Sequence, residues 1–447
     1  MALDLRRALE RVERGDVVRR VGRVSRVIGL LLEAEGAPAS VGELCLIETA
    51  GDGTLPAEVV GFQDGRLLLM PYRAIAGIRP GDRVVPTGAP LSVGVGDGLV
   101  GRVLDGLGRP IDGAGDPWLP ERRRVEGRAP APLDRAPIAR QFVTGVRALD
   151  GLLGVGEGQR LGIFAGSGVG KSVLLGMLAR RAEADVIVLG LIGERGREVR
   201  EFIERDLGAE GLRRSVVVAV TSDATALEKV KGAELAFSVA EHFRDRGRRV
   251  LLMMDSLTRY AMALREIGLA TGEPPASKGY TPSVFAALPR LLERAGSAAT
   301  GSITGLFTVL VEGDDMNDPV ADTVRSILDG HVLLSRRLAT AGQYPAIDVL
   351  ESVSRLFDAV APAEAVAKAR ELTAAMAVYR ENEDLIQIGA YAPGSSPEID
   401  RAIALRPDWQ RFLRQARDER STLDETRGAL SALLGQAAST RQAGVRR

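Results

Sequence analysis

The spacing of hydrophobic positions changes along the chain, and three regions follow from that change. In residues 17–88, short runs rich in β-branched residues alternate with turn sequences such as EGAP, AGDG and RPGD. Short strands at this spacing predict a small antiparallel β-barrel. From about residue 160, apolar runs alternate with helical stretches, which is the βαβ pattern of a parallel sheet. From about Ala361 the pattern is mainly helical, and its end predicts a solvated pair of amphipathic helices.

Two other segments flank these regions. Leu5, Leu9 and Val12 fall at i, i+4 and i+7, on one face of a short N-terminal helix. That face would dock either on the protein's own body or on a partner helix. Residues 116–141 are rich in Pro and Arg and predict a largely irregular connector over a surface.

A glycine-rich segment after one predicted strand carries the most informative chemistry. Residues 162–172 read GIFAGSGVGKS and lead into a helix that extends to about residue 181. Strand, flexible loop, lysine, hydroxyl residue and helix together predict a phosphate-binding P-loop; the alternative is a glycine-rich turn without a ligand. Alanine stands where the strict pattern has its first glycine. The residues that would bind the nucleotide are Ala165, Gly166, Ser167, Gly168, Val169, Gly170, Lys171, Ser172 and Val173.

The P-loop predicts which residues bind the phosphates of ATP and which bind Mg²⁺. Lys171 would contact the β- and γ-phosphates, and the Ser172 hydroxyl would be a ligand of Mg²⁺. The apolar run RVLLMM ends in Asp255, as a Walker B strand ends in a carboxylate. We expect Asp255 to hold Mg²⁺ through water, because this ion keeps several of its waters.

Two more charged positions are candidates for catalysis. Glu194 follows the strand-like run ADVIVLGLI, and ligands bind at the carboxyl ends of strands in open α/β sheets. It is the candidate for orienting and activating the attacking water, the alternative being a surface Glu–Arg pair. Arg355 ends the sequence DVLESVSR and is a candidate arginine finger for the γ-phosphate, although spacing alone does not distinguish it from other arginines.

Composition excludes several classes of protein. The 447 residues suffice for two or three domains, and 59 basic side chains balance 59 acidic ones, which gives no nucleic-acid footprint. With Cys45 alone there is no internal disulfide, and His242 and His331 are too few for a multi-histidine metal site. No apolar run has the ~18–20 residues of a membrane span, and the charged start lacks a signal-peptide core. We therefore expect a cytosolic protein.

The order of further motifs resembles the catalytic subunits of the rotary ATP synthases. These motifs are GERGRE (193–198), MMDSLTRYA (253–261), GSIT (301–304), DDMNDP (314–319), LSRRLA (334–339) and YPAID (344–348). The segments SKGYTPSVFAALPRLLERAG, ADTVRSILDGHVLLSR and ENEDLIQIGAY resemble the flagellar type III protein export ATPases more narrowly. The resemblance extends from about residue 19 to residue 405 and is weakest in the first eighteen residues and the tail.

This resemblance implies an α/β fold with a central RecA-like P-loop ATPase domain in residues 91–370. An N-terminal helix and β-barrel domain would occupy residues 1–90, and a helical domain residues 371–447. It also implies a homohexamer with ATP sites between subunits. One subunit would supply the P-loop, Glu194, Arg195 and Asp255, and its neighbour would supply Arg355. Tyr344 matches the family's adenine-stacking tyrosine, with a core tyrosine near the interface as the alternative.

Partners and location follow from the same resemblance. A dimeric regulatory protein would bind the N-terminal helix, and a coiled-coil stalk protein would enter the ring. Export substrates and their chaperones would dock on the C-terminal domain. The ring would lie in the cytoplasm at the inner face of the cell membrane, below a membrane export gate.

Three alternatives accompany this interpretation. An ATPase of a virulence (injectisome) type III secretion system would share the chemistry and differ in cargo. A hexameric RecA-like helicase is disfavoured by the neutral charge and by the presence of only Phe62 and Tyr72 as aromatic residues in the barrel region. A ring subunit that binds nucleotide without hydrolysis would lack the acidic residue that Glu194 supplies.

Overall fold

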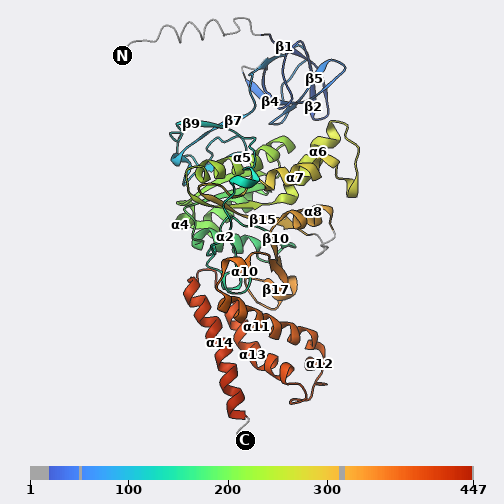
Figure 1. Cartoon of the computed structure of the whole chain (residues 1–447). Coiled ribbons are helices and arrows are strands. Elements are labelled where there is room, and N and C mark those ends of the chain that lie inside the picture. The colour runs from blue at the N-terminus through green and yellow to red at the C-terminus, as the bar shows by residue number, and fades with distance from the viewer. Residues whose placement is uncertain (1–19, 50–52, 312–317, 445–447) are drawn as a thin grey trace, which may run out of the picture. The chain divides into compact units, whose positions relative to one another are not determined.

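The computed structural model describes residues 20–49, 53–311 and 318–444 (Figure 1). The expected N-terminal helix face and most of the DDMNDP motif lie outside these ranges. Contacts between residues divide the chain into two compact units. The first contains residues 1–91 with two short pieces, 225–227 and 269–273, and the second contains the rest.

The first unit confirms the predicted barrel. Six strands close in the order β1-β2-β5-β4-β3-β6, with antiparallel neighbours throughout. Their bounds are β1 (Gly22–Ile28), β2 (Leu31–Glu35), β3 (Leu44–Glu48), β4 (Thr54–Gln63), β5 (Arg66–Pro71) and β6 (Arg83–Pro86). Asp64 and Gly65 both have positive φ and form the two-residue turn between β4 and β5. Leu32, Ile47 and Leu69 fill the interior.

The second unit is built on a large, mostly parallel sheet, as the βαβ pattern predicts. In spatial order its strands are β17 (Ile347–Ser354), β16 (Gly330–Leu334), β10 (Arg160–Ala165), β15 (Ser302–Leu310), β13 (Arg249–Asp255), β11 (Val186–Glu194), β12 (Ser215–Thr221) and β8 (Val103–Leu104), with β14 (Gly296–Ser297) beside β15. Only β14 and β17 pair antiparallel in this sheet. Its central strands are buried nearly throughout, which explains their continuous apolar runs.

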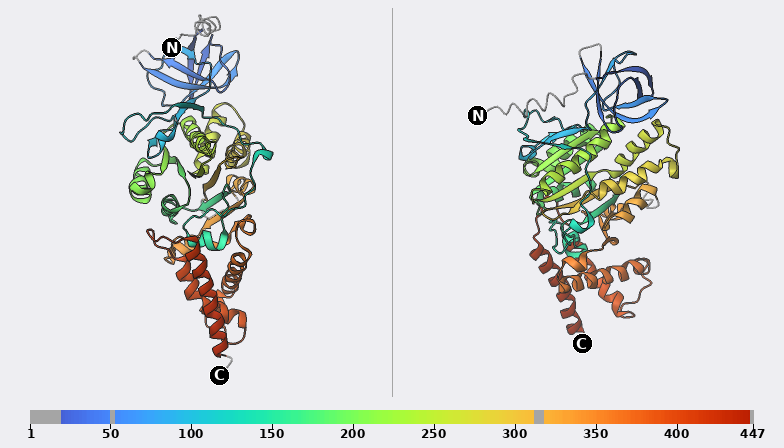
Figure 2. Two further views of the ribbon diagram at one scale, coloured as in Figure 1. Left: turned by 60° about the vertical axis from the view of Figure 1, so that its left-hand side comes forward. Right: turned by 45° about the horizontal axis from the view of Figure 1, so that its top comes forward.

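Helices cover this sheet, and a helical group follows it in the chain (Figures 1 and 2). The covering helices include α2 (Lys171–Arg181), α3 (Gly196–Glu201), α4 (Gly208–Leu212), α5 (Ala226–Arg244), α6 (Leu257–Ala270), α7 (Pro282–Leu292), α8 (Pro319–Ile327), α9 (Arg336–Thr340) and α10 (Phe357–Val360), with π-helical turns at Leu149–Leu153 and Phe202–Leu207. The helical group consists of α11 (Ala363–Glu381), α12 (Glu383–Gln387), α13 (Pro397–Leu413) and α14 (Leu423–Gly444). Helices α11, α13 and α14 pack against one another, which confirms the expected C-terminal helical domain. Among the described residues, no helix combines the length and apolar character needed to span a membrane.

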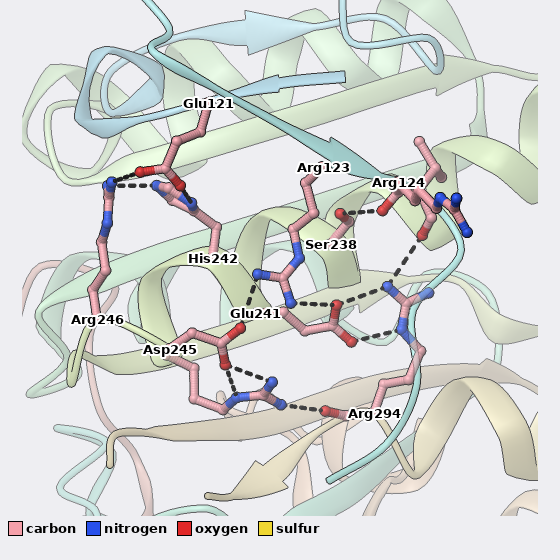
Figure 3. Close-up of polar contacts among 11 residues, drawn as sticks. Glu121, Arg123, Arg124, Ser238, Glu241, His242, Asp245, Arg246 and Arg294 are labelled. Carbon is pink, nitrogen blue, oxygen red and sulfur yellow. Dashed lines mark hydrogen bonds and ion pairs between the residues drawn. The ribbon is translucent and has the colours of Figure 1, made fainter. Parts of the chain in front are cut away.

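The connector is largely irregular, as predicted, and contains one short strand. Residues Glu121–Arg124 form β9, which pairs with β7 (Ser92–Val95). We call residues 121–127 the strap, because this segment lies along α5 (Figure 3). The sequence ERRR looks like solvated surface, yet Arg123 pairs with carboxylates of α5 and Arg122 donates to the Ser92 carbonyl of β7.

Arg123 of the strap pairs with two carboxylates of α5, one of them fully buried and the other half-exposed. Arg123 lies 3.3 Å from the Glu241 carboxylate and 2.8 Å from that of Asp245, both on α5. Arg294, which follows α7, binds the same Glu241 at 2.7 Å and donates to the backbone carbonyl of Val125 at 3.2 Å (Figure 3). Both side chains of the Arg294–Glu241 pair are almost fully buried, so losing Glu241 would leave the Arg294 guanidinium without its buried carboxylate, whereas losing Arg294 would leave Glu241 paired with Arg123.

Candidate active site

The P-loop joins the central strand β10 to helix α2. Strand β10 ends at Ala165 and α2 begins at Lys171. Gly168 and Gly170 have φ of 77° and 88°, a left-handed conformation that glycine adopts without strain. Ala165 is fully buried and does not have a positive φ, so this position has no need of the glycine of the strict pattern. The backbone therefore has the glycine-dependent turns of a phosphate-binding loop in spite of the substitution.

Three predicted side chains converge next to this loop. The Lys171 ammonium lies 2.5 Å from Asp255 Oδ1 and 3.6 Å from Glu194 Oε1. Asp255 ends β13 and Glu194 ends the neighbouring strand β11, so the carboxyl edge of the parallel sheet brings them together. All three side chains are largely buried. The site is therefore largely shielded from solvent. Its ammonium group can bind phosphate oxygens, and its two carboxylates can hold a magnesium ion and a reacting water.

A bulge in β11 directs the carboxylate of Glu194. The pairing of β11 with β12 shifts register between Ile192 and Glu194, and the intervening Gly193 has φ of 76°. A Cβ at Gly193 would lie 3.0 Å from the side chain of Arg259, so the position also needs glycine for space. Bulges of this kind commonly redirect a side chain beside an active site.

The environment raises the pKa of Glu194 above the ordinary value of a glutamate. Burial is the largest cause, because it disfavours the charged form, and the nearby Asp255 carboxylate adds to the rise. The Lys171 ammonium partly offsets this effect. A carboxylate whose pKa is moved toward neutrality is a better proton acceptor at physiological pH.

Thr308 contacts the predicted site and was missed by the sequence interpretation. It lies on β15, and its hydroxyl donates a hydrogen bond of 2.7 Å to Asp255 Oδ1 while remaining fully buried. The hydroxyl thus fixes the orientation of the carboxylate that faces Lys171. Because 53 residues separate the two, no local spacing connects them.

The remaining residues predicted near the phosphates are more exposed. Ser172 is exposed in the first turn of α2, and Val173 beside it is half-buried. The side chain of Arg195 is 75% exposed and pairs with Glu198 at 2.9 Å at the start of α3. Arg195 therefore lies outside the cluster of Lys171, Asp255 and Glu194 in this structure.

Tyr344 lies against the P-loop, between α9 and β17. Its ring atoms lie 3.3 Å from the position that a Cβ on Gly170 would take, and the residue is 45% exposed. A half-exposed aromatic ring beside the phosphate loop presents a face on which a base can stack.

Arg355 lies at the other edge of the sheet. Arg355 directly follows Ser354, the last residue of β17, and Ser354 pairs with Gly330 at the beginning of β16. Ala165, at the P-loop end of β10, pairs with Leu334 at the other end of β16. At 3.3 Å per residue, these four residues of β16 separate the two levels by roughly 13 Å. Arg355 is exposed, so its guanidinium is available to another subunit and lies away from the P-loop of its own chain.

The donor set fits ATP and Mg²⁺. Within residues 20–49, 53–311 and 318–444, no group of three or more His, Cys, Asp or Glu side chains forms a metal cage. One hydroxyl, from Ser172, and one carboxylate, from Asp255, suit an ion that takes its other ligands from water and substrate phosphates.

Comparison with known proteins gives matches over nearly the whole chain. The models of the ATP synthase alpha/beta family match residues 24–88 (beta-barrel domain) and 145–354 (nucleotide-binding domain). The model of the T3SS EscN ATPase C-terminal domain matches residues 361–432. These three matches correspond to the barrel, the large sheet with its helices, and the C-terminal helical group.

Similar proteins of two kinds were found. The flagellum-specific ATP synthase of Bacillus subtilis is 53% identical over 426 residues, which are 95% of this chain and 97% of that protein. The type 3 secretion system ATPase of Xanthomonas euvesicatoria is 51% identical and covers 94% of this chain and 96% of that protein.

The solved structures extend the comparison to three dimensions. The assembled ATPase EscN from the type III secretion system of enteropathogenic E. coli superposes with a TM-score of 0.87 at 45% identity, over 92% of this chain and 99% of that one. EscN in complex with its central stalk EscO gives 0.86 at 44% identity over the same shares.

Proposed function

Because the chain belongs to the type III secretion ATPase family, related to the ATP synthase α/β subunits, we propose that it hydrolyses Mg-ATP to drive flagellar protein export. The observation that supports this proposal most directly is the position of Lys171 between Asp255 and Glu194 beside the P-loop. Within the family, a subunit that only binds nucleotide would lack the acidic residue at position 194.

The reaction is an attack of water on the γ-phosphate of ATP. Glu194 orients the water and accepts its proton, and Lys171 stabilises the negative charge on the phosphate oxygens. The P-loop from Ala165 to Val173 binds the phosphates through its backbone N–H groups, and Tyr344 stacks on the adenine. Positioning and charge stabilisation supply most of the rate.

Magnesium has a place in this site. Ser172 and Asp255 would hold Mg²⁺, Asp255 through water, and the ion would neutralise charge on the phosphates. Thr308 keeps the Asp255 carboxylate in the required orientation.

Two arginines complete the proposal. Arg355 would act on the γ-phosphate bound by a neighbouring subunit in a homohexamer, since it lies away from the P-loop of its own chain. Arg195 would join the site when ATP is bound, and for this it must leave its exposed pair with Glu198.

The biological setting is the finer part of the proposal. The similar flagellar proteins favour the flagellar export apparatus, and an injectisome ATPase is the second candidate because proteins of that kind are about equally similar. We propose domains at residues 1–90, 91–370 and 371–447. The proposed partners are a dimeric regulatory protein at the N-terminal helix, a coiled-coil stalk protein, export substrates with their chaperones, and an export gate at the inner face of the cell membrane.

Hydrolysis measured against protein concentration, with oligomer size recorded in parallel, tests this function. We expect turnover per chain to rise steeply as rings assemble, and Lys171→Ala to abolish it. Lys368→Ala is the matched control, because that lysine pairs with Glu364 on α11, outside the site. Turnover by a monomer, independent of concentration, would refute the shared site, and persistent turnover in Lys171→Ala would refute the P-loop assignment.

A further inference from the structure

The loop that carries Tyr344 is attached to the C-terminal helical group. We call residues 341–346 the tyrosine loop; it joins α9 to β17. The backbone carbonyl of Tyr344 accepts a hydrogen bond of 2.9 Å from the backbone N–H of Gln415, which lies just beyond the end of α13. The position of the ring over Gly170 therefore depends on how Gln415 is held.

Gln415 is held by a saturated set of hydrogen bonds. The residue is only 3% exposed. Its side-chain oxygen accepts from the Arg147 backbone N–H at 2.9 Å, and its amide nitrogen donates to the carbonyls of Gly145 at 2.9 Å and Glu419 at 3.2 Å. A neutral primary amide has two N–H donors and a carbonyl acceptor, and all of them are used here. No other protein side chain combines these donors and this acceptor at the same length.

The surrounding segment is fixed by arginines from the nucleotide-binding domain. Arg147 donates to the backbone carbonyls of Phe412 at 2.8 Å and Arg414 at 2.5 Å. Arg180, near the end of α2, donates to the carbonyl of Arg417 at 2.9 Å. Since α2 begins with Lys171, this segment is linked both to the helix that holds the phosphates and to the loop that carries Tyr344.

We propose that Gln415 is a positioning residue for the base of the nucleotide. It does not contact the nucleotide; it fixes the distance of the Tyr344 ring from the P-loop, so that affinity for ATP depends on this buried amide while affinity for the phosphates alone does not. The inference rests on the proposed function, because it assumes that Tyr344 stacks on the base.

The test compares a ligand that has a base with one that lacks it. Gln415→Glu keeps the shape but places a carboxylate oxygen against the Gly145 and Glu419 carbonyls, and this repulsion displaces the tyrosine loop. We expect ATP to bind about tenfold more weakly, because the displaced ring loses part of its stacking on the base. We expect the Kd of inorganic tripolyphosphate, measured by the same calorimetric titration, to stay within about twofold.

A matched control lies at the end of β10 that is opposite the P-loop. Gln159 is fully buried, and its amide accepts from Gly156 and donates to Asp329 and Ser354. Gln159→Glu introduces the same chemical change away from the nucleotide, so it should leave the ATP-to-tripolyphosphate affinity ratio unchanged. In a Tyr344→Ala background, Gln415→Glu should weaken ATP binding no further, because both changes act through one ring.

Several results would overturn the inference. These are an unchanged ratio in Gln415→Glu, an equal loss for both ligands, or additive losses in the Tyr344→Ala background. Gln415→Met, which keeps the length without a charge, replaces the glutamate variant if that variant does not fold; failure of both to fold would make Gln415 a folding residue and refute the proposal. If the wild-type protein hydrolyses ATP but Gln415→Glu leaves the affinity ratio unchanged, only this inference is refuted. If the wild-type protein has no turnover, the proposed function itself is refuted.

Discussion

Thr308→Val tests whether the orientation of Asp255 matters for turnover. Valine keeps the branched shape of threonine, so the substitution removes the hydroxyl and leaves little cavity. The lost interaction is the 2.7 Å hydrogen bond to Asp255 Oδ1 at a fully buried position. Asp255 then keeps its ion pair with Lys171 but can rotate about its own side-chain bonds.

The size of the effect follows from the charge of the acceptor. A hydrogen bond to a charged group contributes about 1.5–3 kcal/mol, which corresponds to a factor of roughly 10–150 in rate if all of it is lost in the transition state. Lys171 still restrains the carboxylate, so we expect the lower end, about a tenfold fall in kcat. The KM for ATP should change less, because the P-loop itself is untouched.

Steady-state hydrolysis measured beside urea unfolding separates catalysis from folding. Thr304→Val is the matched control: Thr304 is also buried on β15, and its hydroxyl accepts from the Gly158 N–H at 2.9 Å, away from the nucleotide edge. Thr308→Val should lose about 1.5–3 kcal/mol of stability with its charged acceptor, and Thr304→Val about 1–3 kcal/mol, since it leaves the Gly158 N–H without its partner. Equal kcat values in the two variants would refute the claim that Thr308 positions Asp255.

Three further results are expected. Because the pKa of Glu194 is raised, kcat/KM should fall as pH drops through a value above that of an ordinary glutamate, and Glu194→Gln should abolish turnover; an acid limb at the ordinary value would contradict the burial argument. Arg355→Ala and Lys171→Ala should each be inactive, yet a 1:1 mixture should regain hydrolysis because mixed rings contain intact interfaces; no recovery would indicate action within one chain. Glu241→Leu should cost about 3–5 kcal/mol of unfolding free energy, measured by urea titration, because it leaves Arg294 buried without its carboxylate, and adding Arg294→Met should restore much of it, since Arg123 keeps Asp245 as a partner; a Glu241→Leu variant as stable as wild type would contradict this.

The parts of the site that were predicted from sequence are those that local patterns encode. The strands that end at Ala165, Glu194 and Asp255 are apolar runs, and the last two end in the carboxylate that their motifs require. Since parallel strands present their carboxyl ends at one edge, a correct prediction of the strands also places Lys171 near both carboxylates.

The parts that were missed depend on contacts between distant residues. Thr308 is 53 residues from Asp255, and Gln415 is 268 residues from Arg147, whose N–H it accepts. Neither belongs to a motif or to a periodic pattern. The strap was expected to be irregular because the connector is rich in Pro and Arg, and only the fold reveals the buried Glu241 that pairs with Arg123.

The strap also constrains the order in which the chain can mature during synthesis. Val125 and Arg294, which it joins, are 169 residues apart. At about 5–20 residues per second, the ribosome needs roughly 10–30 s between making one and the other. Arg123 has no Glu241 to pair with until α5 has been made, and the Val125 carbonyl has no Arg294 until the chain has passed the end of α7. The contacts of the strap are therefore completed late, and a chain truncated before residue 294 would lack the hydrogen bond that Arg294 donates to the Val125 carbonyl.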